Sequence, residues 1–511
     1  VCIILRHHGQ LLGVGVASNS KQPLLDAATI AFDEANANTI FAQLSQEFKK
    51  QASSSISIEL ELGEKPIASP HVNFKRFANK IDKGIDGVGV RRLQKWDIRM
   101  PAILRLSPKR EVESVLASIC LNVGVHPVIA ISGNLSTNED VTFYKIPTIA
   151  YYQKNAFDEV RILVRGNELV PLLENKTELE KLANQLATHL FMCIRETGSV
   201  IGGYQPETNS LSAPFATPFI QLMVASALEE YAEIAPITMR EKARMNVSLV
   251  LNDVVKKYYD NENIPISIAS AVVITVSLSQ APWNAEVQQF ISECKKYTIQ
   301  VARDITTEKT EIKKPHTLAM VALAISTIAV QSKDKRLKSL AEETCLHCIH
   351  SVPLQSKISI IPWIAEAVLL LNKHGSNLSI SPLNELVDLA LSSQMLVNKN
   401  SDLYGGFQLI NKDGLETDAR GLRMLPMLVQ MKHIKGQNQS LLHHSILGTT
   451  RFIAQLTTSK TSSNRFQNPS MAFGGVRAST WDASMPTEAT AMALIGITRV
   501  LRSISPSDTQ R

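Results

Sequence analysis

The sequence predicts a multidomain α+β protein, in which a small α/β domain is followed by an all-α domain that closes into an (α/α)6 toroid. Strand and helix patterns mix over the first third of the 511 residues, and from about residue 174 only helical patterns recur. We therefore place the two domains at residues 1–165 and 166–511. A short Gly-Gly unit repeats along the helical part, and this repeat favours a closed ring over an open stack of hairpins.

The first domain begins with strands and one helix. Val1–Leu5 and Leu11–Val16 are apolar runs joined by a turn, which predicts a hairpin. Pro23 opens a helix that runs through Ala35. Its apolar side is assigned to Leu24, Leu25, Ala28, Ile30 and Ala31. Ser55–Leu62 then alternates strictly, with isoleucine and leucine on one face and serine and glutamate on the other, which is the period of a half-buried strand.

The second domain is expected to contain about twelve helices of similar length, separated by Pro and Gly breakers. They are expected near residues 174–197, 215–235, 238–259, 265–280, 285–306, 315–331, 335–351, 358–374, 381–396, 417–434, 439–458 and 487–504. Short loops pair them into six antiparallel hairpins. Two architectures fit that count, a closed toroid with inner and outer rings and an open α-solenoid.

A repeated unit favours the toroid. It consists of a Gly-Gly turn, a polar loop, a Thr expected at the N-cap and a helix rich in small residues, and it runs from Gly405 to Ala419, from Gly474 to Ala489 and, more weakly, from Gly202 to Pro218. Paired glycines allow another backbone to approach closely, and an acid after the cap favours the positive helix end. Because copies occur near both ends of the helical region, we predict that the last hairpin packs against the first.

This unit resembles the glycine-glycine-aromatic repeat of the α/α-toroid families, which include terpene cyclases and protein prenyltransferases. The resemblance covers the helical region and implies its fold. The DxDD acid cluster of terpene cyclases is absent, and the Asp, Cys and His zinc ligands of prenyltransferases have no match. Aromatic residues make up only 5% of the chain. The resemblance therefore implies the fold and not the activity.

The first domain resembles the AMMECR family over about the first 100–150 residues. The matching segments are Leu5–Ser18, the helix from Pro23, the strand Ile56–Leu62 and the turn Gly84–Val90. The family's LRGC motif is here Leu11-Leu12-Gly13-Val14, so its Arg and Cys positions are lost. The resemblance thus implies binding or scaffolding for this domain rather than catalysis.

The candidate site is placed at the end of the toroid where the inner helices begin, because unpaired amides and Gly-Gly loops meet there. Carboxylates beside arginines can perform acid/base work on a sugar or another polar substrate. The candidate catalytic residues are Asp418, Asp482 and Glu488, and the candidate ligand-binding residues are Tyr204, Glu207, Arg420, Arg423, Arg477 and Trp481. The alternative is that these acids only cap helices and form salt bridges between loops.

The composition indicates which classes of partner and which cellular compartment to expect. A net charge of +6 spread over 511 residues is too dilute to indicate nucleic-acid binding. No apolar run reaches the roughly 18 residues of a membrane helix, so no membrane span is expected. The six cysteines are expected to be buried free thiols, which favours the cytoplasm, although a cleaved leader upstream of Val1 remains an alternative. Cys345 and Cys348 interleave with His347 and His350 at metal-ligand spacing, but we predict neither metal nor disulfide there, and no cofactor.

Three functions remain open. The leading hypothesis is a two-domain protein that binds a small-molecule or protein ligand in the toroid cavity without evident catalysis, because the catalytic residues of the toroid enzymes are not retained. The first alternative is a toroid enzyme, a hydrolase, lyase or transferase, acting on a carbohydrate-like or isoprenoid-like substrate. The second alternative is an open α-solenoid that serves as an interaction scaffold.

Overall fold

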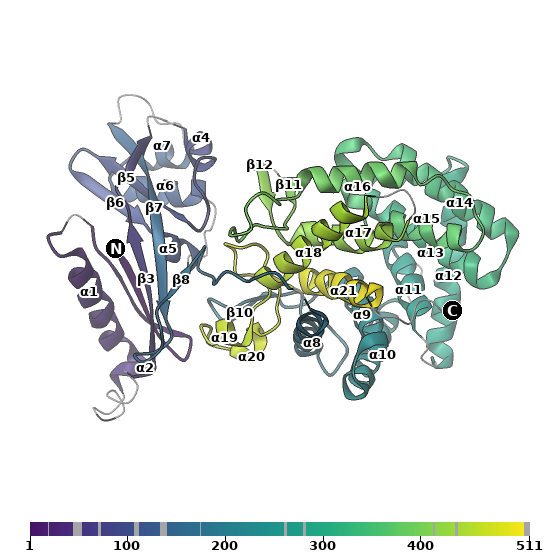
Figure 1. Ribbon diagram of the computed structural model, residues 1–511, viewed down its shortest axis with the longest axis horizontal. Helices are drawn as coiled ribbons and strands as arrows, with labels where there is room; N and C mark the ends of the chain where they lie inside the picture. The colour runs from purple at the N-terminus through teal and green to yellow at the C-terminus, as the bar shows by residue number, and fades with distance from the viewer. Residues whose placement is uncertain are drawn as a thin grey trace.

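The computed structural model describes residues 1–18, 20–43, 47, 54–69, 73–106, 112–132, 140–173, 175–259, 263–279, 283–411, 414–434 and 438–504. Figure 1 shows a sheet domain at one end of the molecule and a larger helical domain at the other, in the order expected from the sequence. The last strand of the large sheet ends at Leu163 and the first toroid helix begins at Lys176.

The small domain is built on one antiparallel sheet. Its strand order is β2-β1-β3-β7-β5-β6, and β4 and β8 each pair with β7. The strands are β1 (Cys2–His7), β2 (Gln10–Val16), β3 (Ile56–Gly63), β4 (Ile67–Ser69), β5 (Asp86–Arg92), β6 (Lys95–Arg99), β7 (Val141–Gln153) and β8 (Arg161–Leu163). The helices are α1 (Pro23–Ala37), α2 (Thr39–Ala42), α4 (Phe74–Ala78), α5 (Pro101–Leu106), α6 (Val112–Asn122) and α7 (Pro127–Ser132).

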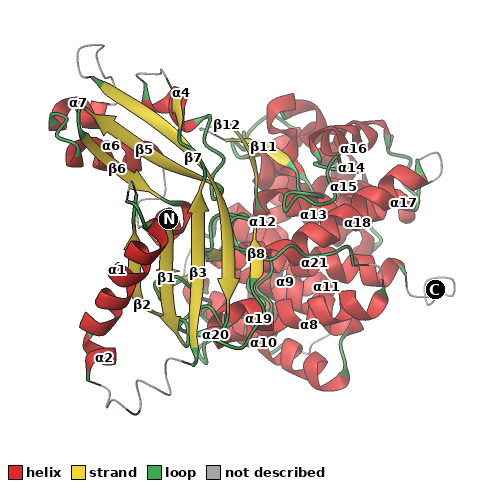
Figure 2. Cartoon of the chain, turned by 60° about the vertical axis from the view of Figure 1, so that its left-hand side comes forward, coloured by secondary structure: helices red, strands yellow, loops and turns green. Residues whose placement is uncertain are grey.

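Helix α1 packs against the sheet through alanine rather than through its larger apolar residues. A Cβ on Gly13 would lie 2.1 Å from the Ala31 carbonyl oxygen, and one on Gly15 would lie 1.8 Å from that of Ala27. The two glycines therefore let the helix backbone touch strand β2, as Figure 2 shows from the side of α1. The sequence placed Leu24, Leu25 and Ile30 on the buried side, but all three are exposed. That assignment was wrong because close backbone packing leaves room only for small side chains.

Strand β3 buries its polar face. Glu59 and Glu61 are 5% and 1% exposed, whereas Ile58 is 38% exposed, the reverse of an ordinary half-buried strand. Arg105 forms ion pairs with both glutamates, and Arg465 of the helical domain lies 2.8 Å from Glu59. Burial raises the pKa of Glu61 to about 7. Burial would also raise the pKa of Glu59, but Arg105 and Arg465 outweigh it and lower that pKa.

The helical domain is an all-α toroid. Within the described residues, twelve helices alternate along the chain between an outer and an inner ring. The outer helices are α8 (Lys176–Cys193), α10 (Ile237–Tyr258), α12 (Ala285–Thr306), α14 (Lys335–Ser351), α16 (Ser381–Ser393) and α18 (Gln439–Leu456). The inner helices are α9 (Pro218–Ile234), α11 (Ile266–Leu278), α13 (Pro315–Ser332), α15 (Trp363–Lys373), α17 (Met424–Lys432) and α21 (Thr487–Ser503). Each inner helix packs against the next, and α21 packs against α9.

The ring closes where the sequence repeat predicted. Strand β9 pairs with β13, so that Tyr204 lies opposite Met485. At the start of α21, the Thr487 amide donates to the Gly202 carbonyl oxygen at 3.1 Å, and the Thr487 hydroxyl donates to the Ile201 carbonyl oxygen at 2.6 Å. The first and last hairpins are thus joined, which confirms the toroid and rules out the open solenoid.

The helical region also contains short strands and turns that the sequence pattern did not predict. They are β9 (Gly203–Gln205), β10 (Ser210–Ala213), β11 (Gln408–Asn411), β12 (Gly414–Thr417), β13 (Met485–Pro486), the 3-10 helices η2 (Leu354–Ile360) and η3 (Ala419–Arg423), and the short helices α19 (Lys460–Ser463) and α20 (Pro469–Ala472). The helix expected over 417–434 is divided accordingly into the end of β12, η3 and α17. These pieces are too short to show a period in the sequence.

The Gly-Gly turns bring backbones together as expected. Gly405 has a φ of +88°, and a Cβ there would lie 1.8 Å from the Gly448 carbonyl oxygen. Gly474 has a φ of +76°, and a Cβ there would lie 2.0 Å from the Gln185 carbonyl oxygen. Each turn therefore presses an inner-helix loop onto an outer helix, and only glycine fits there.

The threonines of the repeat do not share one role. Thr217 caps α9, because its side chain accepts from the Ile220 amide. In the copy that begins at Gly405, the cap is Asp418, whose side chain accepts from the Arg420 amide. Thr487 lies inside α21 and contacts the first hairpin instead. The expected Thr N-cap is therefore confirmed once and wrong twice.

One helix in the described part of the chain is long and apolar enough to cross a membrane by length and composition alone. It is α13, and 72% of its apolar window is buried inside the protein. No apolar stretch of this length was expected from the sequence. The apolar composition of α13 follows from its place in the inner ring, because the helix contacts neighbouring helices on several sides.

All six cysteines are buried free thiols. In α14, Cys345 lies 3.8 Å from the Ser326 hydroxyl of α13, and burial raises the pKa of its thiol to about 12. Cys348 is also fully buried, whereas His350 is exposed. The two thiols of this motif are thus buried, whereas the His350 imidazole is in contact with solvent.

Candidate functional site

The small domain lies against the end of the toroid where the inner helices begin. Besides the Arg465–Glu59 pair, these ion pairs join the domains: Arg6–Glu207 at 2.7 Å, Lys83–Glu416 at 3.6 Å and Arg165–Asp402. The toroid residues in these pairs belong to the loops that lead into α9 and α17. The loops of the repeated Gly-Gly unit therefore face the sheet domain.

Aromatic rings gather at this same end. Phe219, His316 and Trp363 lie in the first turns of α9, α13 and α15, and the Phe219 ring centroid is 6.4 Å from each of the other two. Arg423 precedes α17 and Glu488 lies in the first turn of α21. These five residues, one from the start of each of five inner helices, are called the mouth below. All five are partly exposed.

The mouth carries one loosely held ion pair. Arg423 Nη2 lies 4.0 Å from Glu488 Oε1, and Arg423 Nε donates to the Arg420 carbonyl oxygen at 3.0 Å. The Glu488 side chain is 42% exposed. Burial, together with the positive charges of Lys314 and Arg423, lowers the pKa of His316. The mouth therefore combines an imidazole whose neutral form is favoured with a guanidinium and an accessible carboxyl group.

Side chains fill the centre of the ring below the mouth. The cavity that remains there measures about 50 Å³ and is lined mainly by apolar residues of the inner helices. Arg499 lines this cavity. Its guanidinium donates to Glu230 at 3.1 and 2.7 Å and to Glu366 at 2.9 Å. Phe219 and Trp363 of the mouth also line this cavity.

Two of the acids predicted to be catalytic lie on adjacent loops but are engaged there. Asp418 pairs with Arg420 at 2.6 Å and caps η3. Asp482 accepts from the Ser484 amide at 2.9 Å. The two loops touch through a bridge between Asp418 and Ser479. Of the three predicted acids, Glu488 is the one that lies in the mouth.

Several residues predicted to bind ligand make contacts within the protein. The Tyr204 hydroxyl donates to Asn209 at 2.9 Å, and Glu207 is held by Arg6 of the sheet domain. Arg477 is buried and donates to backbone carbonyl oxygens, and burial lowers its pKa to about 10. Arg423 lies in the mouth, Arg420 pairs with Asp418, and Trp481 lies in a cleft between the domains.

The aromatic part of the mouth is absent from the sequence predictions, although a signal for it is present. Each ring directly follows a proline at the start of an inner helix: Pro218-Phe219, Pro315-His316 and Pro362-Trp363. Proline is favoured at helix starts, so an aromatic residue in the next position occupies the first turn. Because this dipeptide begins three of the six inner helices, it would have indicated a cluster of aromatic side chains at their starts.

Comparisons with known proteins identify no family. No family model and no curated protein matches the chain. Among solved structures, an α-1,6-mannanase from a Salegentibacter species, an inactive variant in complex with α-1,6-mannotriose, is 12% identical, with a TM-score of 0.46 over 63% of this chain and 99% of that one. A family 76 glycoside hydrolase from a bovine Bacteroides thetaiotaomicron strain is 10% identical, with a TM-score of 0.32 over 88% of this chain and 97% of that one.

For an uncharacterized protein from Pyrococcus horikoshii, the identity is 16% and the TM-score 0.23, over 32% of this chain and 77% of that one. At these values the likenesses carry no conclusion about activity. The AMMECR resemblance of the first domain is matched by no family model and stays a prediction.

Proposed function

We propose that the mouth binds a carbohydrate-like ligand. The observation that carries this proposal is the cluster of Phe219, His316 and Trp363 beside the accessible pair of Arg423 and Glu488. A sugar ring has an apolar C–H face that packs on an aromatic ring, and hydroxyl groups that bind carboxylate and guanidinium. Binding sites of this kind combine aromatic walls with a few polar groups that fix orientation.

Binding is favoured over catalysis by the state of the carboxylates. Glycoside hydrolysis ordinarily uses two carboxyl groups about 5 to 9.5 Å apart, one on each side of the bond. Glu488 in the mouth is accessible, whereas Asp418 on the preceding loop pairs with Arg420, and Glu366 of α15 pairs with Arg499. A second carboxylate would have to be released from its arginine before it could act.

The second candidate is a glycoside hydrolase in which Glu488 acts as the acid or base. It is favoured by the position of Asp418 on the turn that leads to Arg423, next to Glu488. If Arg420 moved away on ligand binding, Asp418 would become available as the second carboxylate. This candidate shares the ligand class of the first and differs only in turnover.

Calorimetric titration with a panel of trisaccharides tests the proposal. The panel holds cellotriose, maltotriose, chitotriose and α-1,6-mannotriose, the sugar bound in one of the structures compared above. We expect at least one to bind, and we expect Trp363→Ala to weaken its binding about tenfold or more, or about 1.4 kcal/mol. The matched control is Phe215→Ala, since Phe215 is an exposed ring that stacks on Arg195 outside the mouth.

Hydrolysis of the same sugars, followed by chromatography, separates the two candidates. Release of shorter sugars that stops in Glu488→Gln would establish the hydrolase. Binding without product supports the binding function. If no trisaccharide bound, or if Phe215→Ala and Trp363→Ala lowered affinity equally, the mouth would not be a sugar site.

A further inference from the structure

A second cavity lies between the two domains. It measures about 370 Å³, within the range of small-molecule sites, and both domains line it. The polar residues used below are Lys75, Asn79 and Lys83 from the sheet domain and Glu416, Thr480 and Trp481 from the toroid. We call this cavity the interdomain cleft.

A fixed cluster forms one wall of the cleft. Trp481 Nε1 donates to Glu416 Oε1 at 3.0 Å, and Lys83 Nζ lies 3.6 Å from the same oxygen. Lys83 also sits over the indole, 4.8 Å from the ring centroid. A Cβ on Gly84 would lie 2.8 Å from the Trp481 Cβ, so the sheet domain is pressed against this side chain. The cluster thus holds both domains in one arrangement around the cavity.

The cleft also offers groups that are not engaged. The Thr480 hydroxyl is buried with no hydrogen-bond partner among the described residues. Buried hydroxyls are ordinarily paired, so this one indicates a place for a donor or acceptor. Lys75 and Asn79 at the rim are exposed. The lining also contains Asp82 and Glu113, so groups of both charges are present in the cleft. Such a mixture can donate to and accept from the hydroxyl groups of a polyhydroxylated ligand.

Two loops connect the cleft to the mouth. One carries Glu416 in the cleft and continues through Asp418 to Arg423 in the mouth. The other carries Trp481 in the cleft and continues to Glu488 in the mouth. The loops are joined side by side by the bridge between Asp418 and Ser479. One polar wall therefore runs from the inner helices to the domain boundary.

We propose that the ligand is an extended oligosaccharide, which occupies the mouth with one end and the interdomain cleft with the other. This inference rests on the proposed carbohydrate binding at the mouth. A longer chain that reaches a second set of contacts gains affinity, because the second contact forms within the same complex. The sheet domain would then select for chain length through Lys75, Asn79 and Lys83.

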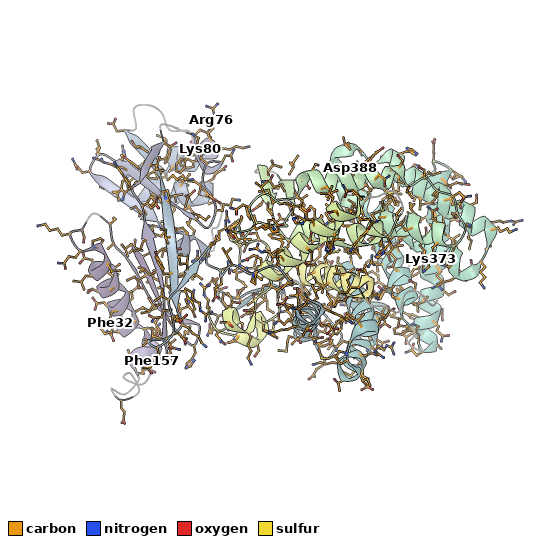
Figure 3. All side chains as sticks on the ribbon, in the orientation of Figure 1. Phe32, Arg76, Lys80, Phe157, Lys373 and Asp388 are labelled. Atoms are coloured by element: carbon orange, nitrogen blue, oxygen red, sulfur yellow. The ribbon has the colours of Figure 1, made fainter. Side chains whose placement is uncertain are left out.

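Titrations with two chain lengths test this inference. The probes are the panel trisaccharide that binds most tightly and the hexasaccharide of the same sugar and linkage (α-1,6-mannohexaose for α-1,6-mannotriose). In the wild type we expect the hexasaccharide to bind about tenfold tighter or more. Lys83→Met and Lys75→Met should each reduce that advantage and leave trisaccharide affinity unchanged. Lys80→Met is the matched control, because Lys80 is exposed on the sheet domain (Figure 3) and does not line the cleft.

The outcomes separate this inference from the proposed function. Trp363→Ala should weaken both sugars, because both use the mouth. Equal affinity for the two lengths, or a length advantage that survives in both Lys83→Met and Lys75→Met, would overturn the extended-ligand inference. Trisaccharide binding that still depends on Trp363 would in that case leave the mouth proposal standing. Loss of all sugar binding in the wild type would overturn both.

Discussion

Arg499 holds the carboxylate of Glu230 with two hydrogen bonds, of 3.1 and 2.7 Å, across the seam where the last inner helix meets the first. Glu366, from α15 on another part of the ring, accepts from the same guanidinium. One arginine thus connects three inner helices at the centre of the toroid. Removing it would leave Glu230 with Arg502, at 3.7 Å, in place of two short hydrogen bonds, and would take the Arg499 ion pair from Glu366.

We therefore predict that Arg499→Met lowers the free energy of unfolding by about 3 to 5 kcal/mol, the usual effect of breaking a buried ion pair. Urea unfolding followed by circular dichroism measures the change. Glu233→Gln serves as the control, because Glu233 pairs with Arg502 while half exposed and should cost less than about 1 kcal/mol. Equal effects of the two substitutions would contradict a central role for Arg499.

A second prediction concerns the close backbone contact at Gly474. Gly474→Ala should destabilise the protein by at least about 3 kcal/mol, because its Cβ would meet the Gln185 carbonyl oxygen. Gly414→Ala isolates the backbone strain alone, since Gly414 also has a positive φ but no atom within 4 Å of its Cβ position. Gly414→Ala should lower the free energy of unfolding by about 1 kcal/mol. Similar unfolding midpoints in urea for the two variants would refute the steric argument.

The third prediction concerns pH. Burial lowers the pKa of His189 from its ordinary value of 6.5 to about 4. The folded state therefore prefers the neutral ring. The contribution of this ring to the free energy of unfolding is complete above pH 6.5 and is lost as pH falls from 6.5 toward 4. Between these limits the free energy of unfolding falls by about 3 kcal/mol.

In His189→Gln this part of the acid dependence should disappear, whereas His350→Gln, which changes an exposed imidazole, should retain it. Denaturant titrations at pH 7, 5.5 and 4.5 compare the three proteins. A wild-type curve that stays parallel to the His189→Gln curve across this range would show that His189 is not the group responsible.

The fourth prediction concerns the domain boundary. Arg6 and Glu207 form an ion pair at 2.7 Å with both side chains 8% exposed. In a double-mutant cycle of Arg6→Met and Glu207→Gln, we expect a coupling free energy of about 1 to 3 kcal/mol. A cycle on the exposed pair of Arg161 and Glu168 should give less than about 1 kcal/mol. Additive effects at the Arg6–Glu207 pair would mean that the pair does not join the domains energetically.

The sequence predicted the helical domain well because its signals are local. Proline at Pro218 and Pro315 opens helices where expected, and the 3.6-residue period needs no knowledge of the neighbours. The Gly-Gly turns were also interpreted correctly, since a turn with paired glycines implies close backbone contact. Their threonines were not, because whether Thr487 caps its helix or binds the first hairpin depends on the ring closure.

The burial of the polar face of β3 could not be predicted in the same way. The alternation over β3 is strict, but the pattern does not tell which face is buried. Glu59 is buried because Arg465, more than 400 residues away in the sequence, meets it across the domain boundary at 2.8 Å. In the mouth, a proline before each ring signals its place at a helix start, but that signal does not tell that Phe219 and Trp363, which come from separate hairpins, lie 6.4 Å apart.

Ring closure also sets an order in time during synthesis. The hydrogen bond from Thr487 to Ile201 joins residues 286 positions apart, so the hairpin that begins the ring must wait until α21 has left the ribosome. Until then the apolar flank of α9 that α21 covers is exposed to water and to other chains. A nascent chain of this protein therefore passes through a long interval in which chaperone binding and aggregation compete with folding, and that interval ends only when the last helix inserts.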